Sequence, residues 1–221
     1  MNWMESRLIT VILGVAVLLA ASVFLTSLTN NIKLPDNQQG YEPVQPIAYS
    51  HRLHAGELGM ACLHCHHGAE RSKAAGIPSA NICMNCHTYV TAPWVNAKAE
   101  DELAAKENRK PRLVVSAELK KLYDGIGLNM EMKPDPAKMP SPPQWVKVHN
   151  LPSFVYFNHS AHVGAGVACQ TCHGAVETME RVRQVSDLSM GWCVNCHRDV
   201  NQRGVNGNKV FASTDCVACH H

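Results

Sequence analysis

Five copies of the motif Cys-x-x-Cys-His use all ten cysteines of this 221-residue chain. Two thiols at this spacing can each bond one vinyl group of a haem, and the imidazole of the next residue then reaches the iron. Zinc sites and redox dithiols share the Cys-x-x-Cys spacing, but neither explains a histidine after every pair. The pattern therefore predicts five covalently bound haem c groups. The attachment residues are Cys62, Cys65, Cys83, Cys86, Cys169, Cys172, Cys193, Cys196, Cys216 and Cys219, and the proximal ligands are His66, His87, His173, His197 and His220.

Eight further histidines are candidates for the second axial ligand. A distal ligand must reach the opposite face of the ring, which excludes His64 and leaves His67 and His221 only for a neighbouring haem. Two His-x-x-His pairs lie just upstream of motifs, each preceded by an aromatic residue. Their spacing lets one imidazole reach its own haem and the other an adjacent one. With one more histidine their number equals the number of haems, so we predict as distal ligands His51, His54, His149, His159 and His162.

Methionine could also serve as the sixth ligand, and it would give a haem a higher reduction potential than two histidines do. Met60, Met179 and Met190 lie close to motifs, and Met139 lies in a proline-rich segment. The sequence leaves open whether Met179, Met190 or His67 replaces one of the five histidines. It contains no evident Ser/His/Asp set, carboxylate pair or glycine-rich phosphate loop. We therefore name no catalytic residue and do not expect the chain to be catalytic alone.

The segments that must position these ligands form a repeat. Residues 49–54 followed by Cys62 match residues 157–162 followed by Cys169, and the motif at Cys83 corresponds to that at Cys193. We predict a first di-haem module over 48–90 and a second one over 156–200, within a C-terminal region, 148–221, that also carries the fifth haem.

The insertion between the modules, 91–147, is first charged and then proline-rich. Apolar spacing predicts one helix over 116–123 with Ser116 as its cap, followed by an extended loop over 133–143. The charge pattern fits a solvated insertion and a docking surface for a partner subunit equally well.

Aromatic residues make up only 6% of the chain, so side chains alone offer little to fill a core. We expect a multihaem cytochrome c fold of loops and short α-helices wrapped around five haems, and an apo chain that does not fold. The formal net charge is +2. About two propionates per haem would make the holo protein negative, which gives no support to nucleic-acid binding.

Residues 8–28 contain no charge and are long enough to cross a bilayer core of about 30 Å. A cleaved signal peptide is the competing interpretation, since Ala20 and Ala21 resemble a cleavage site, but the apolar run continues beyond Val23. We therefore expect a transmembrane signal anchor within 1–30 and an extended linker over 31–47. Because c-type haem is attached on the extracytoplasmic side, we expect a single-pass protein of the cell (inner) membrane with a cytoplasmic N-terminus.

Residues 145–152 (WVKVHNLP), 155–162 (VYFNHSAH) and 190–193 (MGWC), with the five motifs and the N-terminal apolar run, resemble the membrane-anchored pentahaem cytochrome c subunit of alternative complex III. Similar modules occur in the multihaem subunit of quinone reductase complexes from sulfate reducers. The resemblance implies a subunit of a quinol-oxidising respiratory complex that relays electrons to a periplasmic cytochrome c or a terminal oxidase. It implies as partners integral membrane quinol-binding subunits, an iron–sulfur subunit and a monohaem cytochrome c.

Two further functions fit the same motifs. One is a stand-alone membrane-anchored quinol dehydrogenase that feeds a periplasmic reductase. The other is a multihaem reductase with one open catalytic haem, which a high-spin, ligand-binding haem would reveal. The quinone, the acceptor, proton coupling and the pairing of distal ligands with irons do not follow from the sequence.

Overall fold

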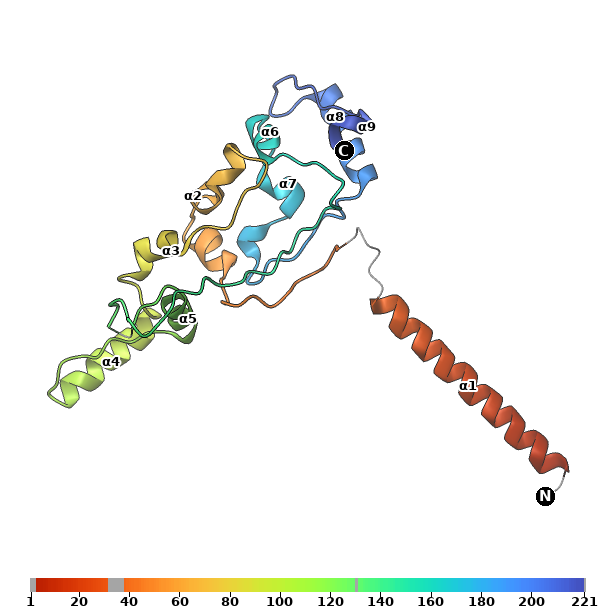
Figure 1. The fold of residues 1–221 in the computed structure, drawn as a ribbon, viewed down its shortest axis with the longest axis horizontal. Helices are drawn as coiled ribbons and strands as arrows, with labels where there is room; N and C mark the ends of the chain where they lie inside the picture. Colours follow the sequence, from red (N-terminus) through yellow and green to blue (C-terminus); the bar gives the residue numbers. More distant parts are fainter. Residues whose placement is uncertain (1–2, 32–37, 130, 221) are drawn as a thin grey trace.

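The computed structural model describes residues 3–31, 38–129 and 131–220, which form helices and loops without any β-strand (Figure 1). Four short helices carry the first, second, third and fifth haem motifs, and longer helices occur at the N-terminus, in the insertion and at the fourth motif. This agrees with the small, helical and loop-rich fold expected of a multihaem cytochrome c. The helices are α1 (Trp3–Asn31), η1 (Arg52–Glu57), α2 (Cys62–Cys65), η2 (His67–Glu70), α3 (Ala80–His87), α4 (Trp94–Lys106), α5 (Ala117–Gly125), α6 (His159–Gly164), α7 (Cys169–His173), η3 (Val176–Thr178), α8 (Met190–Arg203) and α9 (Cys216–Cys219).

The N-terminal helix α1 extends away from the other elements in Figure 1. Over the residues that the structure describes, no helix is both long and apolar enough to span a membrane. The transmembrane helix predicted over 8–28 is therefore not found there. The side chains of Leu8, Thr10, Ser27 and Leu28 lie outside the described residues, as do residues 32–37 of the predicted linker. Residues 38–47 of that linker contain no helix or strand, as expected.

The two halves of the chain pack against each other reciprocally. Helix η1, which follows His51, contacts η3 of the second half, and α6, which begins at His159, contacts η2 of the first half. Equivalent backbone bonds join them: Arg52 N–H donates to the Met179 carbonyl at 2.9 Å, and Ser160 N–H donates to the Ser72 carbonyl at 3.1 Å. Each His-x-x-His segment is thus held by the loop that follows a haem motif of the other half.

Few apolar side chains are buried. Among the described residues they are Ala69, Ala104, Leu122 and Tyr123. Such a small core cannot stabilise a chain of this length. The structure therefore needs a further source of apolar surface, which large flat porphyrins would provide.

The insertion contains α4, α5 and the proline-rich loop. The predicted helix over 116–123 is confirmed as α5, and the Ser116 hydroxyl caps it by accepting from Leu119 N–H at 3.3 Å. Helix α4 was not predicted, because only Ala104 of its thirteen residues is buried and no apolar stripe marks it. The insertion meets the haem region at Tyr123, whose hydroxyl donates to the His87 carbonyl at 2.6 Å.

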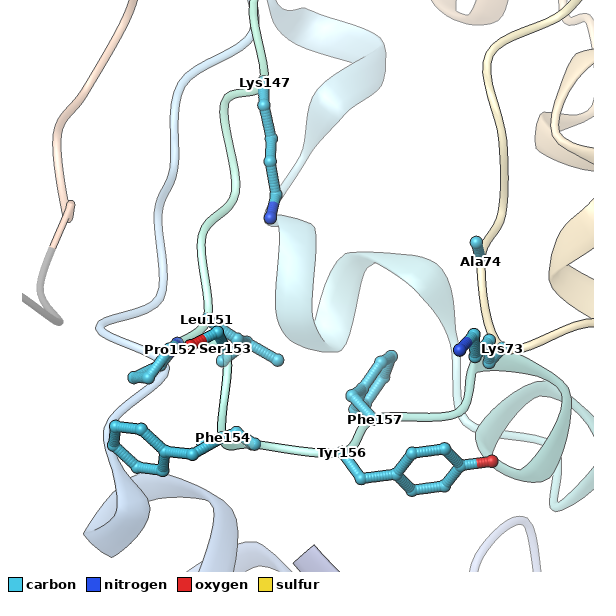
Figure 2. Close-up of a pocket in the computed structure, with 10 residues that line it drawn as sticks. Lys73, Ala74, Lys147, Leu151, Pro152, Ser153, Phe154, Tyr156 and Phe157 are labelled. Atoms are coloured by element: carbon cyan, nitrogen blue, oxygen red, sulfur yellow. The ribbon is translucent and has the colours of Figure 1, made fainter. Parts of the chain in front are cut away.

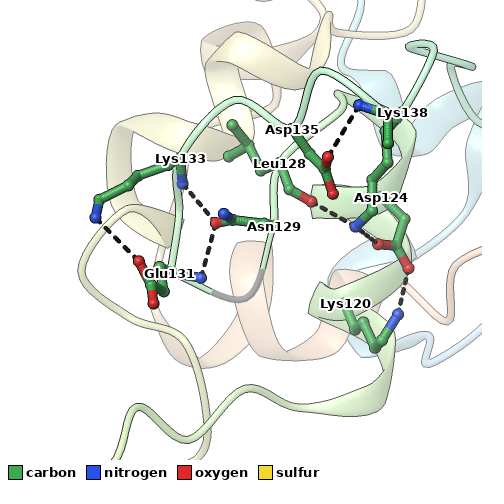
Figure 3. Close-up of polar contacts among 9 residues, drawn as sticks. Lys120, Asp124, Leu128, Asn129, Glu131, Lys133, Asp135 and Lys138 are labelled. Carbon is green, nitrogen blue, oxygen red and sulfur yellow. Dashed lines mark hydrogen bonds and ion pairs between the residues drawn. The ribbon is translucent and has the colours of Figure 1, made fainter.

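Ion pairs fix the proline-rich loop to α5 (Figure 3). Asp124 binds Lys120 one helical turn away and Lys138 in the loop, at 2.5 and 2.6 Å. The Lys138 ammonium also donates to the Leu128 carbonyl at 2.7 Å. As predicted, residues 133–143 contain no helix or strand.

Candidate haem sites

Three proximal histidines are oriented by backbone carbonyls downstream of their motifs. The Nδ1 atoms lie 2.8 Å from Gly76 O for His66, 2.7 Å from Val90 O for His87 and 2.5 Å from Ser213 O for His197. A carbonyl can only accept, so Nδ1 carries the proton and Nε2 is left with a free lone pair. This is the usual arrangement around a metal-binding histidine.

Three predicted distal histidines are oriented in the same way, by backbone carbonyls that precede them in the sequence. Nδ1 of His54 lies 2.8 Å from Ser50 O, and Nδ1 of His162 lies 2.8 Å from Asn158 O. Nδ1 of His159 lies 2.8 Å from Lys73 O, which belongs to the other half. His51 differs, because its Nδ1 is buried with no hydrogen-bond partner in the described part of the chain.

Aromatic residues fix the ring planes of the His-x-x-His pairs. Tyr49 stacks on His54 with ring centroids 4.4 Å apart, and Phe157 stacks on His162 at 4.5 Å. The same two rings contact the first histidine of each pair edge-on, His51 at 4.9 Å and His159 at 4.8 Å. The two halves therefore repeat one geometry for four of the predicted ligands.

Three distal histidines face a proximal histidine at nearly one separation. The ring centroids lie 6.1 Å apart for His54 and His87, 6.0 Å for His162 and His197, and 6.4 Å for His159 and His173. Metal–nitrogen bonds of about 2 Å on both sides of one ion would place two imidazole centroids about 6 Å apart. Each pair therefore leaves the space that one haem iron requires.

By the repeat, His51 and His66 correspond to His159 and His173. Burial, and then the nearby His66, lower the pKa of His51 to about 4. Burial is also the main reason that the pKa of His173 is lowered to about 4, with His149 as the next cause. Both imidazoles are neutral at physiological pH, and the neutral form is the one that binds a metal.

His149 occupies a different position from the other predicted distal ligands. Its Nε2 lies 3.2 Å from Nδ1 of His173, with the ring centroids 4.3 Å apart. It thus contacts the side of His173 that carbonyls occupy at the other motifs. Its role as a distal ligand stays a prediction.

The fifth motif has no comparable pair among the described rings. His220 lies beside Phe154, with ring centroids 5.7 Å apart, and it pairs through its backbone with Val155. His221 lies outside the described residues. Three residues that could have supplied a sixth ligand are exposed: His67, Met190 at 68% and Met139 at 89%. His64, which the sequence excluded, is exposed too.

Cysteines of different motifs lie close enough to raise the pKa of one another's thiols. Burial is the first cause of a raised pKa at four thiols, and at each the next cause is a cysteine of another motif: Cys65 for Cys83, Cys62 for Cys169, Cys196 for Cys172, and Cys219 for Cys193. If the motifs are numbered along the chain, these electrostatic neighbours are the second and first, the first and third, the third and fourth, and the fourth and fifth motifs. The first and third motifs meet where the two halves join.

These observations fit haem. The side-chain core is small, paired imidazoles leave room for an iron, and the attachment thiols form a continuous series. The backbone carbonyls of Lys73, Gly76, Val90 and Ser213, which orient the histidines, carry no side-chain signal and could not be found from the sequence.

Comparison with known proteins agrees with this geometry in both halves of the chain. Residues 28–110 match the class III cytochrome C family, and residues 155–221 match the family of cytochrome c7 and related cytochrome c. The chain is also 24% identical over 196 residues to the "Menaquinone reductase, multiheme cytochrome c subunit" of Nitratidesulfovibrio vulgaris, a match that covers 80% of this chain and 76% of that protein. Both halves of the chain are therefore related to the multihaem cytochromes c, which transport electrons on covalently bound c-type haem.

Proposed function

We propose that the chain is a five-haem electron-transfer subunit of a quinone-linked respiratory complex. The observation that carries this proposal is the set of histidine pairs that face each other in both halves of the chain, with ring centroids 6.1, 6.0 and 6.4 Å apart. Haems held in series exchange single electrons, and the protein sets each potential through axial ligands, burial and charge. Electrons would pass through the motifs in the order second, first, third, fourth, fifth, or in the reverse order.

The proposed partners are the subunits of a membrane complex. The relative from Nitratidesulfovibrio vulgaris is named as a subunit of a menaquinone reductase. Together with the resemblance to alternative complex III, this supports integral quinol-binding subunits, an iron–sulfur subunit and a monohaem cytochrome c or oxidase as neighbours. We place the haem region on the extracytoplasmic side of the cell membrane, where c-type haem is attached, and we propose the uncharged run over 8–28 as the tether.

A multihaem reductase with one open haem is the second candidate. It is favoured by His220, which has no facing histidine among the described rings. A stand-alone quinol dehydrogenase is the third, and it would oxidise a quinol analogue without other subunits.

Three measurements on the detergent-extracted protein test the proposal. Intact mass should show five added haems, and electron paramagnetic resonance should show low-spin ferric iron only. Affinity purification should recover large multi-helix partners, and membranes should release the protein with detergent but not with high salt. Fewer than five haems would overturn the five-haem assignment, a high-spin haem that binds carbon monoxide would favour the reductase, and quinol oxidation by the isolated chain would favour the dehydrogenase.

A further inference from the structure

His173 differs from the other proximal histidines in the group that faces its Nδ1 atom. At three motifs a backbone carbonyl accepts from this atom, whereas at His173 its neighbour is the Nε2 atom of His149, 3.2 Å away. A histidine that binds iron through Nε2 carries its proton on Nδ1. His173 must then donate and His149 must accept, so this hydrogen bond occupies the Nε2 lone pair of His149.

The two imidazoles beside His173 lie at different separations from it. The ring of His159 is parallel to that of His173 within 8°, and the centroids lie 6.4 Å apart, which is the separation that one iron requires. The ring of His149 is tilted by 79°, with the centroids only 4.3 Å apart. No metal ion fits between two imidazoles at that separation. His159 thus has the separation of an axial ligand, and His149 has that of a hydrogen-bond partner.

The backbone on both sides of His149 is anchored independently of its imidazole. The Gln45 amide forms two bonds of 2.9 Å with the backbone of Val146, donating to the carbonyl and accepting from the N–H. The side-chain oxygen of Gln184, which is fully buried, accepts from Asn150 N–H at 3.2 Å. These contacts fix the position of the segment that carries His149.

One stretch of chain supplies both neighbours of His173, ten residues apart. Within it, residues 151–157 line a cavity together with Lys73, whose carbonyl lies 2.8 Å from Nδ1 of His159 (Figure 2). The ring of Phe157 contacts His159 edge-on at 4.8 Å. This stretch therefore carries a hydrogen-bond acceptor at one end and an axial ligand at the other.

We propose that His149 is a positioning residue for the third-motif haem, and that the bond from His173 Nδ1–H to His149 Nε2 lowers the reduction potential of that haem. This inference rests on the proposed function, since it requires a haem at the third motif. An acceptor for the free N–H of an iron-bound imidazole makes that imidazole more basic, which favours ferric iron. The role replaces the distal ligation that the number of histidines predicts for His149.

The test is a redox titration of the holo protein at about pH 8, where an ordinary imidazole is neutral, followed by visible absorption and electron paramagnetic resonance. His149→Ala should leave the number of low-spin haems unchanged. It should raise the potential of one haem by about tenfold in its reduction equilibrium, which is about 59 mV for one electron. His149→Gln should retain the wild-type potential, because the glutamine Oε1 can replace the imidazole Nε2 as acceptor.

His159→Ala identifies the haem concerned. It removes the imidazole that faces His173, and it should convert the third-motif haem to a high-spin form that binds carbon monoxide. The low-spin signal that is lost in His159→Ala should be the one whose midpoint shifts in His149→Ala. His64→Ala is the matched control, because His64 is exposed, and it should change neither the spin state nor the midpoints.

The inference is overturned if His149→Ala creates a high-spin haem that binds carbon monoxide, because His149 would then be a distal ligand. It is also overturned if His149→Ala shifts no midpoint more than His64→Ala does, or if His149→Gln shifts the midpoint as far as His149→Ala.

If His149→Ala loses a haem, His149→Gln decides between the two roles, because glutamine can accept the bond but does not replace histidine at the iron. A low-spin haem at the wild-type midpoint supports the inference, and a high-spin haem overturns it. Intact mass of the wild-type protein reports the number of haems separately. A failure of the five-haem assignment is therefore distinguishable from a failure of this inference.

Discussion

The imidazole rings of His162 and His197 lie 6.0 Å apart, although His162 precedes the third motif and His197 ends the fourth. His54 and His87 repeat this relationship in the first half at 6.1 Å. In both halves the second histidine of the His-x-x-His pair skips the nearest motif and faces the next one. One short helical segment therefore positions a histidine toward each of two neighbouring haem motifs.

Replacement of this distal histidine should open one iron. We expect His162→Ala to convert one of five haems from low-spin to high-spin and to let it bind carbon monoxide, because no other described ring faces His197. Electron paramagnetic resonance and a carbon monoxide difference spectrum measure both effects. His64→Ala is the control, since His64 is exposed. An unchanged low-spin spectrum in His162→Ala would assign the distal position to another residue.

Tyr123 connects the insertion to the second motif. Its side chain is 1% exposed, and its hydroxyl donates to the His87 carbonyl at 2.6 Å. Tyr123→Phe should lower the free energy of unfolding by about 1–2 kcal/mol, because a part-buried carbonyl loses its partner. Calorimetry measures the change, and Tyr89→Phe, at a residue 85% exposed, should be neutral. Equal stability of the two variants would contradict a structural role for this bond.

Glu100 makes the insertion sensitive to acid. The Arg109 guanidinium, and then the Arg112 N–H, lower the pKa of this carboxyl from 4.5 to about 2. A carboxyl with a depressed pKa in the folded state stabilises the fold above its unfolded value, and this contribution disappears as the pH falls from about 4.5 towards 2. Limited proteolysis across this range should show the insertion becoming susceptible first. Glu100→Gln should make susceptibility independent of pH there, whereas Glu102→Gln, at an exposed pair with Lys98, should retain the wild-type profile.

Gln184 is fully buried and joins three segments. Its backbone carbonyl accepts from Gly40 N–H, and its backbone N–H donates to the Tyr41 carbonyl. Its side-chain oxygen accepts from Asn150 N–H at 3.2 Å. Gln184→Ala should lower the free energy of unfolding by about 2–3 kcal/mol, because it leaves a cavity and an unpaired backbone N–H. Thermal unfolding measures this loss. Gln144→Ala, in the exposed loop, should change it little, and a similar small effect at Gln184 would refute its role as a junction.

The sequence predicted what depends on local patterns. The motifs identified the attachment residues by type and spacing, and Ser116 marked the start of α5 because capping is a local property. The pairing of His54 with His87 depends on the path of the backbone between them, which no short pattern encodes. His149 shows the same limit, since a count of histidines placed it with the distal ligands while the fold sets it beside His173.

The reciprocal contacts between η1 and η3, and between α6 and η2, bear on how such a chain arose. Each half supplies the carbonyls that the other half needs, so a half-length ancestor with this architecture would have completed itself as a symmetric homodimer. Gene duplication and fusion would then have joined the two copies covalently. Once fused, the copies could diverge. Lys73 and Glu180, which are each the seventh residue after the proximal histidine of their half, are an example of such divergence.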